Sequence, residues 1–166
     1  MRLQLSTFLI ILVIVSSCKE EGEQRPYKTG MEGKPMPSFG IQLLDSATYL
    51  NSKDIPAGKN LVLFYYSPTC PYCRAQMREM VENIKMFNDK QLCILSSADL
   101  KSIKEFVNYF KLESNKNVFI GRDTGAIIVT NYGLTSIPFT AYFDEKRNLK
   151  VAYTGRMNSN MLLKVQ

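Results

Sequence analysis

Hydrophobic positions change their spacing along the chain, and each change marks a predicted element. Two runs, residues 61–66 and 91–95, are apolar at nearly every position, which is typical of strands buried on both faces of a sheet. Shorter apolar segments separated by polar turns predict two hairpins, one from residues 39–44 and 48–50 and one from residues 139–143 and 149–153.

Other segments have apolar residues three and four positions apart, which predicts helices with one apolar face. The first helix follows two closely spaced cysteines, and its apolar positions are Met77, Met80, Val81, Ile84 and Phe87. Asp99 is suited to cap the second, whose inner face is Ile103, Phe106, Val107 and Phe110. A third helix is predicted for residues 124–132, with Gly133 in its C-terminal turn, and a short fourth from about Asn158. The order of these elements predicts a mixed α/β sandwich of three layers.

The N-terminal segment has the features of an export signal. Arg2 precedes the apolar residues 8–15, a stretch too short to span a bilayer. Val15-Ser16-Ser17-Cys18 resembles the lipobox of bacterial lipoproteins, which implies that residues 1–17 are a signal peptide and that Cys18 is lipidated. The alternative is an ordinary secretory signal followed by an unmodified thiol.

The residues after Cys18 bear on which membrane of the cell envelope would hold the protein. The cysteine is not followed by aspartate, and Lys19-Glu20-Glu21 resembles a lysine-acid-acid tag for surface export, although a charged tether explains these residues equally well. We expect a lipid anchor in the outer membrane, with its periplasmic or surface face left open. Residues 18–37, polar and rich in Gly and Pro, predict a flexible tether, and residues 38–166 a single domain.

Composition excludes several kinds of chemistry. The net charge of +6 comes from scattered lysines, so we interpret it as surface solvation and expect no nucleic acid partner. The sequence has no histidine, which excludes histidine-based metal sites and Ser-His or Cys-His catalysis. We predict neither a metal nor a cofactor.

The remaining chemistry centres on Cys70 and Cys73, in the order Cys-Pro-Tyr-Cys, where a buried strand gives way to a helix. If Cys70 is the N-cap, Pro71 falls at the first helical position, and the Cys73 N–H can donate to the Cys70 sulfur. That bond and the positive end of the helix stabilise the Cys70 thiolate, the nucleophile of disulfide exchange. A zinc site would lack ligands, and a structural bridge over two residues would constrain little chain entropy. Redox exchange is the favoured interpretation.

Residues 58–77 and 132–140 together resemble the thioredoxin-like superfamily, and the leading hairpin makes the TlpA/ResA branch of membrane-anchored thiol–disulfide oxidoreductases the best fit. The resemblance implies a central mixed sheet with an N-terminal hairpin extension. It also implies a cis Ile137–Pro138 bond facing the cysteines, with the Ile137 main chain pairing with substrate. A proline that merely starts a strand is the alternative for Pro138. Pro71 and Tyr72 would contribute to the docking surface.

Two positions depart from the family pattern. Phe64 stands where thioredoxins have a buried aspartate, and Gln76 where ResA-type proteins have a glutamate, so neither can carry the proton of Cys73. We therefore predict a high pKa for Cys73 in the reduced form. Cys93 lies within an apolar strand and is interpreted as a core residue.

Two functions remain open from the sequence. The first is a thiol–disulfide oxidoreductase acting on cysteines of exported proteins, with reduction favoured over oxidation, together with an unidentified redox partner. The second is a non-catalytic thioredoxin-like binding module that uses the groove beside Pro138.

Overall fold

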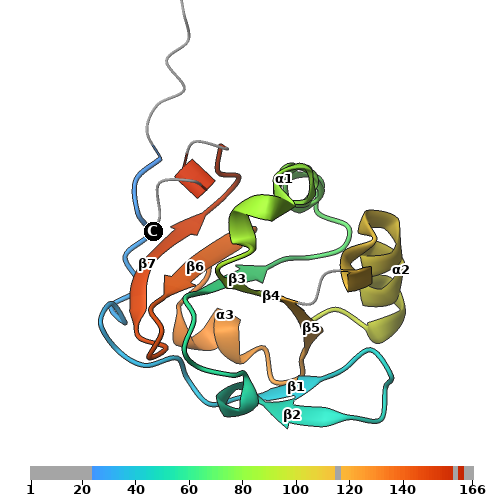
Figure 1. Ribbon diagram of the computed structural model, residues 1–166, viewed down its shortest axis with the longest axis horizontal. Coiled ribbons are helices and arrows are strands. Elements are labelled where there is room, and N and C mark those ends of the chain that lie inside the picture. The colour runs from blue at the N-terminus through green and yellow to red at the C-terminus, as the bar shows by residue number, and fades with distance from the viewer. Residues whose placement is uncertain (1–23, 115–116, 159–160, 163–166) are drawn as a thin grey trace, which may run out of the picture.

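The computed structural model describes residues 24–114, 117–158 and 161–162 (Figure 1). The predicted signal peptide and Cys18 lie outside these residues, as does most of the helix predicted from Asn158. None of the described helices combines the length and hydropathy that crossing a bilayer requires.

A seven-stranded mixed sheet forms the middle layer, in the order β2-β1-β5-β4-β3-β6-β7. β3 pairs in parallel with β4, and β4 with β5, whereas β6 runs antiparallel to β3. The predicted three-layer mixed α/β fold is confirmed. The strands are β1 Gly40–Gln42, β2 Tyr49–Asn51, β3 Leu61–Tyr65, β4 Gln91–Ser96, β5 Val118–Asp123, β6 Phe139–Phe143 and β7 Leu149–Thr154.

Alternation along β3 divides the core in two. Val62 and Phe64 face a cluster shared with the long helices α1 (Pro71–Glu82) and α2 (Leu100–Phe110). Leu61 and Leu63 face a second cluster on the side of α3 (Ile127–Asn131). Both faces of the strand are therefore buried, which explains its continuous apolar run.

The helices follow the predicted pattern with small differences at their ends. The Asp99 side chain accepts from Ser102 N at 2.9 Å and caps α2, as predicted. The apolar run after the cysteines is divided between α1 and a 3-10 turn, Ile84–Phe87, and α3 is shorter than the predicted range of residues 124–132. Gly133 follows α3 with φ of 58°, the left-handed conformation that a helix C-terminus favours. Two further 3-10 turns span Ser52–Asp54 and Leu112–Ser114.

A strand lies between α2 and α3 where none was predicted: β5 fills that interval, so the prediction of no strand there was wrong. Only three apolar residues open this strand, and Gly121, Arg122 and Asp123 end it. Gly121 is required by packing: a Cβ there would lie 2.3 Å from Ile41 Cγ2 of β1. The glycine makes β5 hard to recognise in the sequence, but it also allows β1 of the N-terminal hairpin to pair closely with β5.

Residues 24–37 differ from the predicted flexible tether. Tyr27 N donates to Ala152 O at 2.7 Å, and its hydroxyl donates to Gly133 O at 2.6 Å. Gly33 N donates to Leu149 O in β7, and Met36 N donates to Arg147 O just before that strand. This stretch therefore lies along the domain and is held mainly by main-chain hydrogen bonds. Because such bonds do not depend on side chains, they produce no periodic apolar pattern in the sequence.

Candidate active site

The two cysteines and Pro138 lie at the same edge of the sheet. β3 and β6 are neighbours, and Tyr65, the last residue of β3, pairs with Phe139, the first of β6. Cys70 follows Tyr65 by five residues, and Pro138 comes directly before Phe139. The loop that carries the cysteines and the loop that carries Pro138 therefore leave adjacent strands at the same end.

Cys70 has the geometry of a helix N-cap. Its φ and ψ are −72° and 120°, and its Sγ accepts a hydrogen bond from Cys73 N at 3.3 Å. Pro71 occupies the first helical position, where its missing N–H leaves no hydrogen bond unmade. Cys70 is half-buried, so a sulfur at the positive end of a helix remains partly accessible.

Cys73 lies one turn inside and has no exposed surface. It packs in the core cluster with Tyr66 and Met77. Burial raises the pKa of the Cys73 thiol, and its hydrogen bond with the Cys70 side chain raises it further. This direction agrees with the high pKa predicted for Cys73. The pair is thus asymmetric, with one accessible sulfur and one in a dry environment.

Tyr66 is a neighbour of Cys73 that the sequence analysis did not single out. Burial raises the pKa of its phenol, and the nearby Cys73 adds to this rise. Its ring packs on Phe106 at 4.2 Å between centroids, and its hydroxyl is buried without a hydrogen-bond partner in the described part of the chain. Its place in a continuous apolar run gave no signal of a polar role.

The Ile137–Pro138 peptide bond is cis, as the family resemblance implied. Pro138 is buried, whereas Ile137 is half-buried and packs against both core clusters. Tyr72 is 66% exposed beside Cys70. These positions at one edge are compatible with the predicted substrate contacts.

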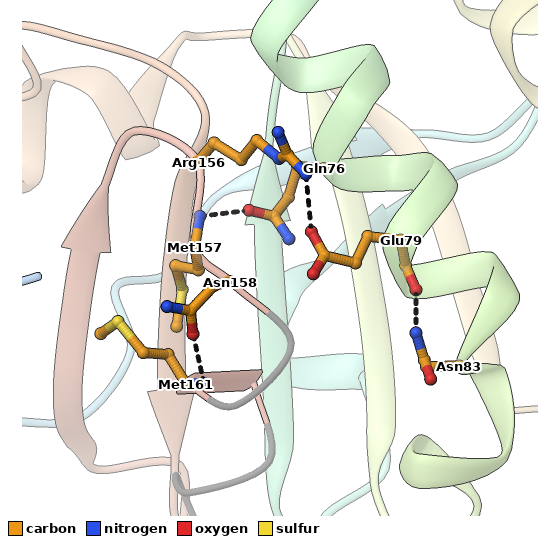
Figure 2. A network of polar contacts seen from close by, with 7 residues as sticks. All are labelled: Gln76, Glu79, Asn83, Arg156, Met157, Asn158 and Met161. Atoms are coloured by element: carbon orange, nitrogen blue, oxygen red, sulfur yellow. Dashed lines mark hydrogen bonds and ion pairs between the residues drawn. The ribbon is translucent and has the colours of Figure 1, made fainter. Parts of the chain in front are cut away.

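Neither candidate position supplies an acid to Cys73. Phe64 is fully buried among apolar side chains. Gln76, also fully buried, uses its Oε1 to accept from Met157 N at 2.5 Å (Figure 2). Its Nε2 has no hydrogen-bond partner among the described residues. An ion pair at 3.5 Å between Glu79 and Arg156 lies beside this contact and joins the same two segments. Gln76 therefore connects α1 to the segment after β7 through a hydrogen bond. No spacing in the sequence indicates this long-range contact.

Cys93 lies on the other face of the sheet from Cys73, in the cluster beside α3. It is fully buried, and burial raises its pKa to about 12. This supports its interpretation as a core residue. The structure thus brings together Cys70, Cys73, Ile137 and Pro138, and separates Cys93 from them.

Comparison with known families gives one match that spans most of the chain. The Redoxin family model matches residues 31–164. The chain belongs to the Redoxin family. Membership and fold identify it as a thioredoxin-like oxidoreductase, which confirms this part of the resemblance found in the sequence. A comparison with curated proteins finds no match.

Solved structures with the same fold include proteins from several bacteria. A secreted Mycobacterium tuberculosis disulfide oxidoreductase homologous to E. coli DsbE has a TM-score of 0.61 at 20% identity, covering 75% of this chain and 91% of that one. The exposed lipoprotein thioredoxin Etrx1 of Streptococcus pneumoniae has a TM-score of 0.58 at 23% identity, covering 77% and 96%. The thioredoxin domain of a Bacteroides vulgatus thiol-disulfide oxidoreductase has a TM-score of 0.62 at 14% identity, covering 80% and 92%. At these identities the likeness establishes the fold.

The asymmetry of the Redoxin site predicts selective alkylation. In the reduced protein at pH 7, iodoacetamide should modify Cys70 and leave Cys73 and Cys93 unmodified, because only the Cys70 sulfur is accessible to the reagent, whereas the other two are buried. Modification of Cys73 in a Cys70→Ser variant should rise only above about pH 8.5, the ordinary range of a thiol. Peptide mass spectrometry after timed labelling measures both. Equal labelling of Cys70 and Cys73 at pH 7 would contradict the assignment.

The contact between Gln76 and Met157 predicts a stability effect away from the sulfurs. Gln76→Met keeps the side-chain volume but leaves the Met157 N–H unpaired, which should cost about 1–3 kcal/mol of unfolding free energy. Urea unfolding of the wild type and the variant measures this. The control is Arg156→Gln, which removes a partly exposed ion pair worth at most about 1 kcal/mol. If the two variants lose equal stability, the Gln76 contact is not the stronger link.

Proposed function

We propose that this Redoxin protein is a thiol–disulfide oxidoreductase that uses Cys70 as its attacking sulfur and Cys73 as its resolving sulfur. The observation that carries the proposal is the hydrogen bond of 3.3 Å from Cys73 N to Cys70 Sγ at the start of α1. It stabilises charge on the accessible sulfur and holds the second sulfur within one helical turn. Ile137 and Pro138, at the same edge, are the proposed contacts for an extended substrate segment.

Reduction of a substrate disulfide proceeds in two exchanges. The Cys70 thiolate attacks one substrate sulfur, so that a Cys70–substrate bond forms, the substrate S–S bond breaks and a substrate thiolate leaves. Cys73 then attacks the Cys70 sulfur and releases the second substrate thiolate, leaving a Cys70–Cys73 disulfide. The protein loses two electrons and the substrate gains them. Another dithiol, the redox partner, must return them by the same exchange.

The proton of Cys73 must leave before the second exchange, and neither Phe64 nor Gln76 offers a carboxylate to accept it. The substrate thiolate released in the first exchange is a base that forms close to the site. We propose that this thiolate, directly or through water, accepts the Cys73 proton. The buried hydroxyl of Tyr66 and Nε2 of Gln76 are neutral donors, and they would stabilise the resulting Cys73 thiolate.

Exported proteins are the proposed substrates, and reduction is the proposed direction. Disulfides persist outside the cytoplasm, and the N-terminal signal features would send the chain there. The likeness to a secreted disulfide oxidoreductase and to an exposed lipoprotein thioredoxin supports the cell envelope as its location.

Two serine variants test the roles of the sulfurs. Cys70→Ser should abolish reduction of insulin disulfides, because the nucleophile is gone. Cys73→Ser should accumulate a mixed disulfide between Cys70 and the substrate, because nothing resolves it. Non-reducing electrophoresis and an insulin turbidity assay measure these outcomes, with Cys93→Ser as the control that should retain activity.

The same variants separate the alternative, a binding module without turnover, which the missing acid beside Cys73 favours. A binding module would show no turnover in the wild type and no reversible cycling of the two cysteines in a glutathione redox titration. Unchanged activity in both serine variants would overturn the proposed enzyme.

We further propose that Cys18 carries the lipid anchor in the outer membrane. Expressed in a bacterial host, the full chain should incorporate labelled palmitate and sediment with membranes, and Cys18→Ser should do neither. Fluorography and membrane fractionation measure this. Equal sedimentation of both forms without label would indicate an uncleaved signal or a peripheral association instead.

A further inference from the structure

Cys70, Arg74 and Arg78 lie along one line on the surface of α1, because each follows the last by four residues. Arg74 N donates to Cys70 O at 3.0 Å, so the two residues are stacked on successive turns. Arg74 is half-buried and Arg78 is exposed. A partner segment held on the Cys70 sulfur would therefore begin about one helical turn, ~5.4 Å, from Arg74.

The Arg74 side chain is fixed by the neighbouring helix. Its Cζ lies 4.5 Å from the centroid of the Tyr109 ring of α2, and its Nη1 donates to Pro68 O at 3.3 Å, in the loop before Cys70. The rings of Phe106 and Phe110 lie behind it at 5.7 and 5.5 Å. α1 and α2 lie side by side on this face of the sheet (Figure 1). Stacking of this kind orients the guanidinium while leaving some of its five N–H donors for a ligand.

Neither arginine belongs to an ion pair found among the described residues. The ion pairs found there join Lys90 to Asp89 and Arg156 to Glu79. The hydrogen bond of the Arg78 side chain with Tyr109 and the positive charge of Arg78 lower the pKa of that phenol, and Arg74 adds to the effect. Like charges four residues apart on a helix repel each other, so a carboxylate bound between Arg74 and Arg78 would reduce this repulsion.

One exposed aromatic side chain belongs to the same surface. Tyr109, against which Arg74 stacks, is 59% exposed. An exposed tyrosine beside arginines is the composition of a protein-binding hot spot.

We propose that Arg74, Arg78 and Tyr109 form a docking site for an acidic segment that flanks the reactive cysteine of the partner protein. A glutamate or aspartate carboxylate of that segment accepts paired hydrogen bonds from the Arg74 fork, and Arg78 adds a second cation. This inference rests on the proposed function, because Cys70 must react with the partner for the flanking residues to reach Arg74. It adds a substrate class: disulfides next to acidic residues.

Three peptide disulfides that differ only in the residues flanking one cysteine, Glu-Glu, Gln-Gln or Lys-Lys, test the proposal. The measurement is the second-order rate constant of their reduction by the reduced full-length protein, divided by the rate constant with dithiothreitol to remove intrinsic reactivity. At low salt the Glu peptide should exceed the Lys peptide by about tenfold, and at about 0.5 M salt the ratio should fall toward one.

Substitutions assign the effect to the surface. Arg78→Gln, at an exposed position that cannot affect folding greatly, should lower the ratio severalfold, and Arg74→Gln with Arg78→Gln should abolish it. Arg74→Lys keeps the charge but loses the fork, and should recover only part of the ratio. The control, Lys150→Gln, removes one charge from the exposed surface of β7 and should leave the ratio unchanged.

The outcomes separate the two levels of the argument. Equal normalised rates for all three peptides, or a ratio that survives in the double variant, would overturn the docking site and leave the oxidoreductase standing. Failure of the wild type to reduce any of the peptides, with dithiothreitol reducing them all, would overturn the proposed function and the docking site with it.

Discussion

The contact from the Cys73 N–H to the Cys70 sulfur determines how the rest of the site is arranged. It requires β3 to end and α1 to begin within six residues, with Cys70 extended and Pro71 already helical. Once this geometry is made, one sulfur lies at the positive end of a helix and the other lies a turn deeper, against the core. The two thiols therefore differ in access, and burial raises the pKa of Cys73, through position alone.

The dry environment of Cys73 creates the main chemical difficulty of this site. Burial disfavours the thiolate, and the two positions where the family resemblance implied an acid hold Phe64 and Gln76. The oxygen of Gln76 is occupied by Met157 N, so this residue connects α1 to the C-terminal segment (Figure 2). The buried Tyr66 hydroxyl, in the same core cluster as Cys73, is a neutral donor that can stabilise a thiolate but cannot take up its proton. In such a site, the attack of Cys73 on the mixed disulfide would depend on the departing substrate thiolate taking up the Cys73 proton.

Local signals in the sequence were sufficient for most of the fold and for the central motif. The continuous apolar run of residues 61–66, the Asp99 cap and the Cys-Pro-Tyr-Cys order each act within a few residues, and each appears in the structure as predicted. What the sequence could not supply depends on distant partners. β5 is recognisable only with β1 against Gly121, residues 24–37 are ordered by carbonyls of β7, and Gln76 meets Met157 from 81 positions away. Arg74 likewise appears as one cation among many until α2 brings Tyr109 beneath it.

Two kinds of recognition meet at Cys70, and their physical requirements differ. Main-chain pairing at Ile137 would accept almost any extended segment, because every residue carries the same N–H and C=O groups. Main-chain pairing therefore gives binding without sequence specificity. Choice among partners needs side chains held in a fixed orientation, and an arginine stacked on Tyr109 and tied to Pro68 O has lost much of the freedom that weakens ordinary surface ion pairs. Because the arginine lies on the helix that carries Cys70, a carboxylate that engages it also fixes the distance of the partner sulfur from the attacking one. Selection and orientation would then arise from the same contact.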